Sequence, residues 1–274
     1  MVSIGSIISM GITLVICFVV PLILLWVIRR RFQASIKSFL VGMMAFIIAT
    51  QILEAPINAY FLVFNETTVQ WLTSNSLLYA LYGGLMAGVF EETARYLSYK
   101  WVLKKQTRIQ DSLSYGVGHG GMEAMLIVGT TYINNLVLSL LINQGFIENL
   151  GLSAELQETV VTQLTQVSPL LFSLAGYERL MTLIIQIGLS VIVFKAIRER
   201  NMVYYIIAIL IHALLDFPAV LAQLGVLNLY MVEGIVTLVA LGFMIFIMKQ
   251  LKVYRQDLTK AEDEELEKYK QAGY

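Results

Sequence analysis

The chain has 274 residues, of which 58% are hydrophobic and 14% are charged, whereas a soluble domain has about 45–50% and about 25%. These proportions indicate an integral membrane protein and exclude an ordinary soluble enzyme. The 19 basic residues equal the 19 acidic ones in number, and no basic tract predicts binding to nucleic acid. The single cysteine, Cys17, excludes a disulfide framework and a thiolate metal cluster.

Apolar stretches of about 20 residues predict membrane-spanning helices. Seven such stretches occur, at 6–28, 39–63, 76–103, 112–142, 177–197, 202–223 and 229–249. The predicted fold is an all-α polytopic bundle over residues 1–250, followed by a charged cytoplasmic tail over 251–274. The first span is followed by three arginines and preceded by no basic segment, which is the reverse of a cleaved signal peptide.

Two spans carry local signals. Glu54 and Pro56 interrupt the second span, and the proline predicts a kink there. Gly84 and Gly88 give the third span the small-residue spacing at which helices pack closely.

The connection 143–176 is acidic and long enough to hold a helix. Ser153 predicts the start of this helix and Pro169 its end. One face would carry Leu156, Val160, Leu164 and Val167. We expect the segment to lie on the outer leaflet, to cover a site as a lid, or to serve as a plain connector. The tail over 257–270 alternates acids and bases, which is typical of a solvated helix or a disordered segment.

Basic residues alternate between connections, which predicts the orientation. They occur at 29–37, 104–108, 195–200 and in the tail. The other connections hold no Lys or Arg, at about 64–75, 143–176 and 224–228. Because basic connections stay in the cytoplasm, we expect the N-terminus outside and the C-terminus inside.

Charged groups nevertheless lie inside the predicted spans. They are Glu91, Glu92, Arg95, Glu123 and Asp216. Unpaired and dehydrated, these five would together cost on the order of 15 kcal/mol. Such a cost must be offset, and we therefore interpret the protein as a bundle built around one polar site.

Three spans each carry a polar pair four residues apart, so that each pair lies on one helix face. The pairs are Glu91 with Arg95, His119 with Glu123, and His212 with Asp216. Counted from the cytoplasmic ends of the spans, all lie roughly 10–21 Å deep at 1.5 Å per residue. Pairs at one depth on three helices are predicted to converge, with Glu92 beside them.

Neutral imidazoles and carboxylates are the ligands of catalytic zinc, which commonly has three protein ligands and one water. Two histidines and one carboxylate fill three places, and a second carboxylate can take a proton from the water. The remaining acids and Arg95 can orient the ligands. Taken singly, each residue is equally a buried, hydrogen-bonded polar group.

The three motifs together resemble the YhfC family of intramembrane metalloproteases, which is similar to the PrsW and CAAX-type proteases. They are Glu91-Glu92-x-x-Arg95, Gly116-x-Gly118-His119-Gly120-Gly121-x-Glu123 and His212-x-x-x-Asp216. The resemblance covers the third to sixth spans. It implies that Glu91 and Glu92 are catalytic, that His119 and His212 bind metal or water, and that Asp216 is their partner.

The resemblance also assigns further residues and shows departures. Tyr115 and His119 look like the aromatic-x-x-x-His motif of CAAX-type relatives, and Glu123 is similar to the glutamate of that motif in PrsW-type relatives. CAAX-type chains have one more residue between the glutamates and the arginine. Glu178-Arg179 match a pair expected in YhfC-type chains, but Gln186 stands where a histidine is expected.

The sequence thus predicts an intramembrane endopeptidase of the bacterial cell membrane. Its cofactor would be a divalent metal, zinc, unless a glutamate–histidine pair activates water alone. Its partners would be the lipid bilayer and a membrane-embedded or membrane-proximal peptide or protein substrate. The alternatives are a proton- or ion-coupled transporter, since intramembrane acids and histidines also form proton relays, and a non-catalytic peptide-binding or immunity protein.

Overall fold

A computed structural model describes the backbone of residues 1–271 and the side chains of residues 1–254. The described residues form helices and no strand, so the predicted all-α polytopic fold is confirmed. The α-helices are α1 (Ile4–Phe32), α2 (Ile36–Ile47), α3 (Ala55–Ala59), α4 (Glu66–Thr73), α5 (Ser76–Leu97), α6 (Ile109–Glu123), α7 (Thr130–Gln144), α8 (Ala154–Gln166), α9 (Pro169–Arg198), α10 (Val203–Gln223) and α11 (Leu229–Gln271). The π-helical segments are η1 (Ile48–Glu54), η2 (Tyr60–Phe64), η3 (Ser98–Val102) and η4 (Ala124–Gly129), and η5 (Ile147–Leu150) is a 3₁₀ turn.

Six helical stretches are long and apolar enough to cross a membrane. They are Ile4–Phe32, Ile36–Phe64, Ile109–Gln144, Pro169–Arg198, Val203–Gln223 and Leu229–Tyr254. Helix α5, predicted as a seventh span, is not among them because its charged residues lower its hydropathy. Its 22 residues nevertheless extend about 33 Å, the thickness of a hydrocarbon core. The seventh span and the orientation of the termini therefore stay predictions.

Some predicted boundaries differ from the structure. Helix α9 begins at Pro169, eight residues before the expected start at 177, and Ser168 caps it by accepting from the amide of Leu170. Proline suits a first helical position because its missing N–H needs no partner there. Helix α11 continues to Gln271 without a break at 250, so the division between bundle and tail stays a prediction.

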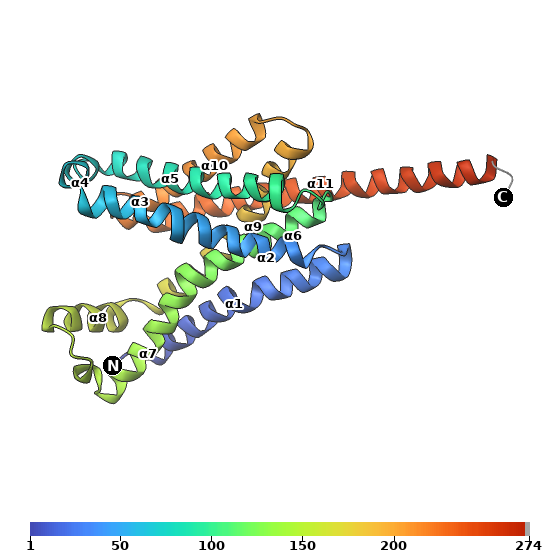
Figure 1. Ribbon diagram of the computed structural model, residues 1–274. Coiled ribbons are helices and arrows are strands. Elements are labelled where there is room, and N and C mark those ends of the chain that lie inside the picture. Colours follow the sequence, from blue (N-terminus) through green and yellow to red (C-terminus); the bar gives the residue numbers. More distant parts are fainter. Residues whose placement is uncertain (272–274) are drawn as a thin grey trace.

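The predicted helix in the long connection is confirmed as α8, which Ser153 caps by accepting from the amide of Leu156. Its apolar face is partly packed, because Leu164 is 3% exposed and belongs to one apolar cluster with Met10 and Phe172, whereas Leu156 is 48% exposed. Helix α8 is thus attached to α1 and α9 at the end of the molecule that carries the N-terminus (Figure 1).

The interruption expected at Glu54 and Pro56 takes the form of the π-helix η1, which ends directly before α3. The amide of Ala55 bonds the carbonyl of Thr50, five residues back. A π-helical turn holds one residue more than an α-helical turn would, and such turns are frequent at functional sites. Here the wide turn sets the direction in which Glu54 and the residues after it point.

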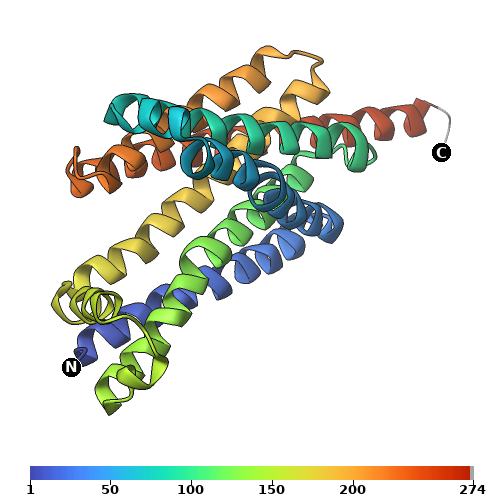
Figure 2. The same cartoon turned by 60° about the vertical axis from the view of Figure 1, so that its left-hand side comes forward.

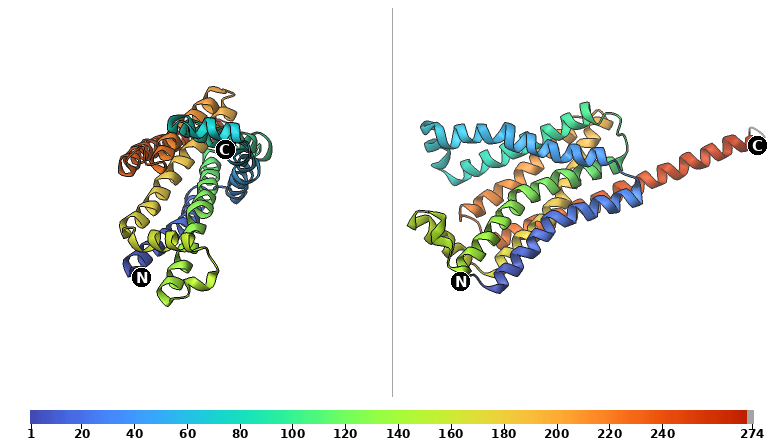
Figure 3. Two further views of the ribbon diagram at one scale, coloured as in Figure 1. Left: turned by 90° about the vertical axis from the view of Figure 1, so that its left-hand side faces the viewer. Right: turned by 60° about the horizontal axis from the view of Figure 1, so that its bottom comes forward.

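The helices form two groups that diverge toward the end carrying the N-terminus (Figure 2). One group contains α2 with α3, α5, α10 and the first half of α11, and the other contains α1, α7 and α8. Helices α6 and α9 run between the groups. The N-terminus and α8 lie at one end of the bundle, and the C-terminus lies at the opposite end (Figure 3).

Glycines bring the helices of the site into backbone contact. A Cβ on Gly118 of α6 would overlap the carbonyl of Phe39 on α2, and one on Gly42 would overlap that of Tyr115. On α5, a Cβ on Gly84 would lie 2.5 Å from the carbonyl oxygen of Ala213 on α10. The close packing predicted for the third span is therefore confirmed.

This contact predicts the effect of a single methyl group. Gly84→Ala should destabilise the protein by about 1–3 kcal/mol, because the new Cβ meets backbone that cannot turn aside. Thermal melting in detergent should show a lower Tm. Gly242→Ala is the matched control, since nothing lies within 4 Å of its Cβ position and alanine favours a helix by up to about 1 kcal/mol. Equal melting of the two variants would contradict the packing described.

Candidate functional site

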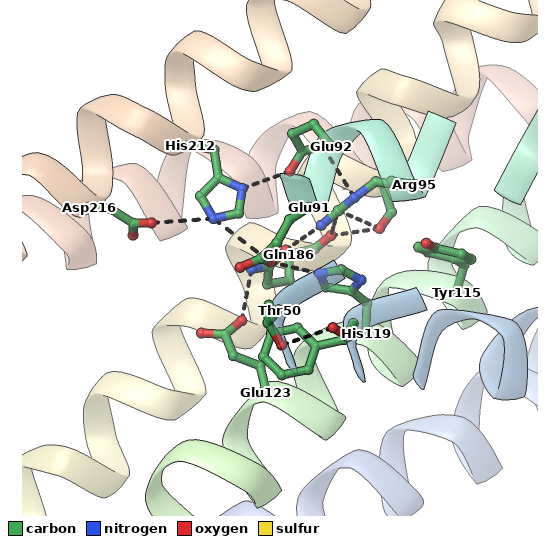
Figure 4. A network of polar contacts seen from close by, with 12 residues as sticks. Thr50, Glu91, Glu92, Arg95, Tyr115, His119, Glu123, Gln186, His212 and Asp216 are labelled. Atoms are coloured by element: carbon green, nitrogen blue, oxygen red, sulfur yellow. Dashed lines mark hydrogen bonds and ion pairs between the residues drawn. The ribbon is translucent and has the colours of Figure 1, made fainter. Parts of the chain in front are cut away.

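Two consecutive glutamates of α5 meet the two histidines. Glu91 Oε2 lies 2.8 Å from His119 Nε2 of α6 and 3.9 Å from His212 Nε2 of α10. Glu92 Oε1 lies 2.7 Å from His212 Nδ1, and its other oxygen lies 3.2 Å from Arg95 Nε. Figure 4 shows these contacts. Three helices thus bring their polar side chains to one place.

The centre is enclosed by protein. Glu92, Arg95 and His119 are fully buried, and Glu91 and His212 are 6% and 5% exposed. Removing one member of a buried ionic set is strongly destabilising, because it leaves the others uncompensated. The mutual pairing of these groups therefore offsets their cost inside an apolar bundle.

His119 is held by aromatic rings as well as by Glu91. Phe46 of α2 approaches it edge-on with ring centroids 5.3 Å apart, and Tyr115, one turn earlier on α6, stacks at 5.9 Å. The glycines of this motif permit close packing on both sides of α6. Gly118 faces the backbone of α2, whereas Gly116 and Gly120 face α9.

Arg95 connects α5 to α9. Its guanidinium donates to the carbonyl of Gln186 at 2.8 Å, to Ser190 Oγ at 2.8 Å and to Gln186 Oε1 at 2.5 Å. The amide of Gln186 in turn donates to Glu123 Oε2 at 2.7 Å. Gln186 therefore links the arginine of α5 to the glutamate of α6.

Glu123 and the Glu178-Arg179 pair form the far end of this chain of contacts. Arg179 donates to Glu123 Oε1 at 2.9 Å and also pairs with Glu178. Both carboxylate oxygens of Glu123 are thus bound to α9 side chains. From the sequence, Gln186 was noted only as the place where a histidine is expected. Its spacing of eight residues from Glu178 was the available signal that the two side chains lie on the same side of α9.

A cavity of about 460 Å³ adjoins the centre. Glu91 and His212 form part of its wall, together with Glu123, Glu178 and Arg179. Asp216 lines it too and lies 3.5 Å from His212 Nε2, with 38% of its side chain exposed. The fully buried Glu92, Arg95 and His119 stand behind this wall. Glu91 is thus the one glutamate of the pair that a molecule in the cavity can contact.

The expected metal centre does not fit this arrangement. The residue types suit zinc, because two imidazoles and a carboxylate are a known catalytic set. Glu123, however, is turned toward α9. Within residues 1–254, no group of three or more His, Cys, Asp or Glu side chains is arranged to hold an ion. The expected ligand set is therefore not assembled here, namely His119, Glu123, His212 and Asp216.

These features define a polytopic helical membrane protein with an enclosed glutamate–histidine centre beside a cavity. Residues 16–237 match the family model described as YhfC intramembrane metalloprotease, and the chain belongs to the YhfC family. It is 35% identical over 259 residues to the uncharacterized membrane protein YhfC of Bacillus subtilis (strain 168), covering 93% of this chain and 100% of that relative. No solved structure matches. The resemblance drawn from the three motifs is confirmed.

The link through Gln186 can be tested by exchanging two side chains. Gln186→Glu places a carboxylate against Glu123, and Glu123→Gln faces one amide with another. Each single variant should lose about 1–3 kcal/mol, because a buried hydrogen bond is broken. The double exchange allows the contact between residues 186 and 123 to form again with donor and acceptor reversed, while Arg95 and Arg179 still find a side-chain oxygen at these positions. Melting of all four proteins should therefore give a favourable coupling of about 0.5–3 kcal/mol, and purely additive effects would contradict the link.

Proposed function

We propose that this protein is an intramembrane endopeptidase that hydrolyses a peptide bond of a membrane-embedded or membrane-proximal peptide or protein. One observation carries the proposal, namely that Glu91 faces a cavity while its carboxylate contacts both histidines of the chain. The family's description as intramembrane metalloproteases supports the same reaction class.

Glu91 is the general base in this proposal. A carboxylate in the cavity wall can accept a proton from water as the water oxygen attacks the scissile carbonyl. The same proton then passes to the leaving nitrogen as the C–N bond breaks, which returns Glu91 to its starting state. Glu92 is unsuited to this role, because it is fully buried and its two oxygens face His212 and Arg95.

The two histidines take different roles. His212 presents Nδ1 to Glu92, and a carboxylate paired with arginine accepts, so Nδ1 carries the hydrogen. Its Nε2 is left facing Glu91 and Asp216 at the cavity, where it can orient water or hold a proton. His119 lies behind Glu91 and fixes the direction of that carboxylate, so we assign it as a positioning residue.

The family description implies a metal, which would supply a polarised water. The side chains as arranged form no group that could hold the ion, so the proposed steps use protein groups alone. The glutamate–histidine alternative from the sequence is therefore the form of the mechanism that this geometry supports.

The transporter alternative needs a path on both sides of the centre. On the predicted cytoplasmic side of Glu91, the next turns of α5 and η3 carry Tyr99 and Leu103, which are 3% and 1% exposed. They pack in one cluster with Tyr115 and Phe194. A closed apolar layer there supports a site that receives a substrate over one that passes an ion onward.

The proposal predicts a difference between the two glutamates. Glu91→Gln keeps the shape of the side chain but removes the proton acceptor, so cleavage should fall about 10²–10⁴-fold. The assay is cleavage of co-expressed single-span substrates, with melting of each purified variant as the folding control. Glu148→Gln is the matched exchange at an exposed position and should cleave like the wild type. Full activity of Glu91→Gln would remove the proposal.

Chelation tests the metal-free form of the mechanism. Because the described side chains form no ion-binding group, we expect wild-type protein dialysed against a chelator to keep cleaving its substrate. Zinc is measured on the same samples by elemental analysis. Loss of cleavage that added zinc alone restores would mean that His119 or His212 moves to bind the ion in the working enzyme.

A further inference from the structure

Most residues of the cavity wall lie on one side of the centre, and the direction of each helix shows toward which end of the bundle. On α5, the cavity residues Gly83 and Ala87 precede Glu91. On α10, the cavity residues Ala219 and Gln223 follow His212. These helices run antiparallel, since successive glycines of α5 meet successively earlier residues of α10. Both sets are therefore displaced from the centre toward the same end.

The opposite wall points the same way. Glu54, the last residue of η1, and Asn58 of α3 line the cavity and follow Phe46, which touches His119. On α9, Glu178 and Thr182 line the cavity and precede Gln186. Each displacement leads to the end that carries the N-terminus, α4 and α8 (Figures 1 and 3).

That end is the predicted extracytoplasmic face. The connections that reach it, at about 64–75, 143–176 and 224–228, contain no Lys or Arg. Basic residues gather in the connections at the other end, which the positive-inside rule assigns to the cytoplasm. The apolar layer of Tyr99 and Leu103 closes the centre on that cytoplasmic side.

The size of the cavity indicates what it can hold. Its volume of about 460 Å³ lies within the roughly 300–1,000 Å³ that is typical of ligand pockets. A short segment of extended chain suits a cavity of this size.

The walls also match the needs of an extended chain. Backbone N–H and C=O groups that leave a helix inside a membrane need new partners, because each unsatisfied group costs several kcal/mol. Amide and hydroxyl side chains line the cavity on facing helices, at Gln51, Asn58, Thr182 and Gln223. Asn58 already bonds Glu54 and Tyr82, and Thr182 donates to the carbonyl of Glu178. Each keeps a further hydrogen or lone pair that can meet a substrate backbone without selecting a sequence.

We infer that the substrate reaches Glu91 through this cavity from the extracytoplasmic face, and that the substrate class is an unwound, extended segment of peptide chain exposed on that face. That the molecule entering the cavity is a substrate rests on the proposed function. The route itself is a property of the fold and can be tested without any cleavage.

Thiol labelling tests the route. Ala87→Cys places a thiol in the cavity wall. A charged, membrane-impermeant methanethiosulfonate should label this thiol in right-side-out vesicles. It should not label the thiol in inverted vesicles, where the reagent meets only the cytoplasmic face. The wild type gives the background, because its single cysteine, Cys17, is fully buried. Val89→Cys, 43% exposed on the lipid face of the same helix, should be labelled from neither side, and Lys104→Cys only from the cytoplasmic side. Labelling of Ala87→Cys from the cytoplasmic side alone, or from neither side, would overturn the route.

Cleavage separates the route from the proposed function. Labelled Ala87→Cys should cleave about 100-fold more slowly than the unlabelled variant, since small displacements of substrate already cost that much, while Val89→Cys is unaffected by the reagent. Two single-span substrates, with the scissile segment toward the outer or the cytoplasmic end, are compared in the same cells. Cleavage of the cytoplasmic one alone would overturn the inference. Outside labelling with no cleavage of either would leave the route standing and count against the protease.

Discussion

The ion pair between Glu92 and Arg95 is the interaction on which the centre depends. It joins two charges within one turn of α5, and each partner then reaches another helix. Glu92 binds His212 of α10, and Arg95 binds Gln186 and Ser190 of α9. Because Glu92 and Arg95 are fully buried and cannot turn to water, one turn of α5 fixes the relative positions of three helices. The catalytic candidate Glu91 directly precedes Glu92 in the chain, so its backbone is held in place by the same contacts.

Short side chains impose a second constraint, which is close helix packing. A glutamate and a histidine reach each other only when their helices lie near contact, and glycines provide that approach. Gly84 and Gly88 hold α5 against α10, while Gly118 holds α6 against α2. The polar centre thus depends on the glycines, because without their close approach the glutamates and histidines would not reach each other.

Much of the polar centre could be predicted from the sequence, because the spacing of polar residues and their depth along each span are both local features of the chain. Spacing by four placed His212 and Asp216 on one face, and the depth of the three pairs indicated that they meet. The partners of the Glu123 side chain could not be predicted in this way. Its spacing from His119 favoured a ligand, whereas its partners are Arg179 and Gln186, because the packing of α9 against α6 brings their side chains to it.

Hydropathy is least decisive at α5. Its charges remove it from the helices apolar enough to span, although its Glu91, Glu92 and Arg95 make the contacts with the two histidines and with α9. The π-helical turns could not be predicted either, since a sequence shows where proline weakens a helix but not how the neighbouring helices accommodate the change.

The turn at η1 has a consequence for the register of the second span. A π-helical turn is equivalent to one residue inserted into an α-helix, and each residue rotates the helix by about 100°. With a regular helix over 48–54, everything beyond it would face about a quarter of a circle away. Glu54 and Asn58 would then leave the cavity, and Tyr82 would lose the oxygen to which it donates. The outer wall of the cavity therefore depends on a single extra residue in the chain.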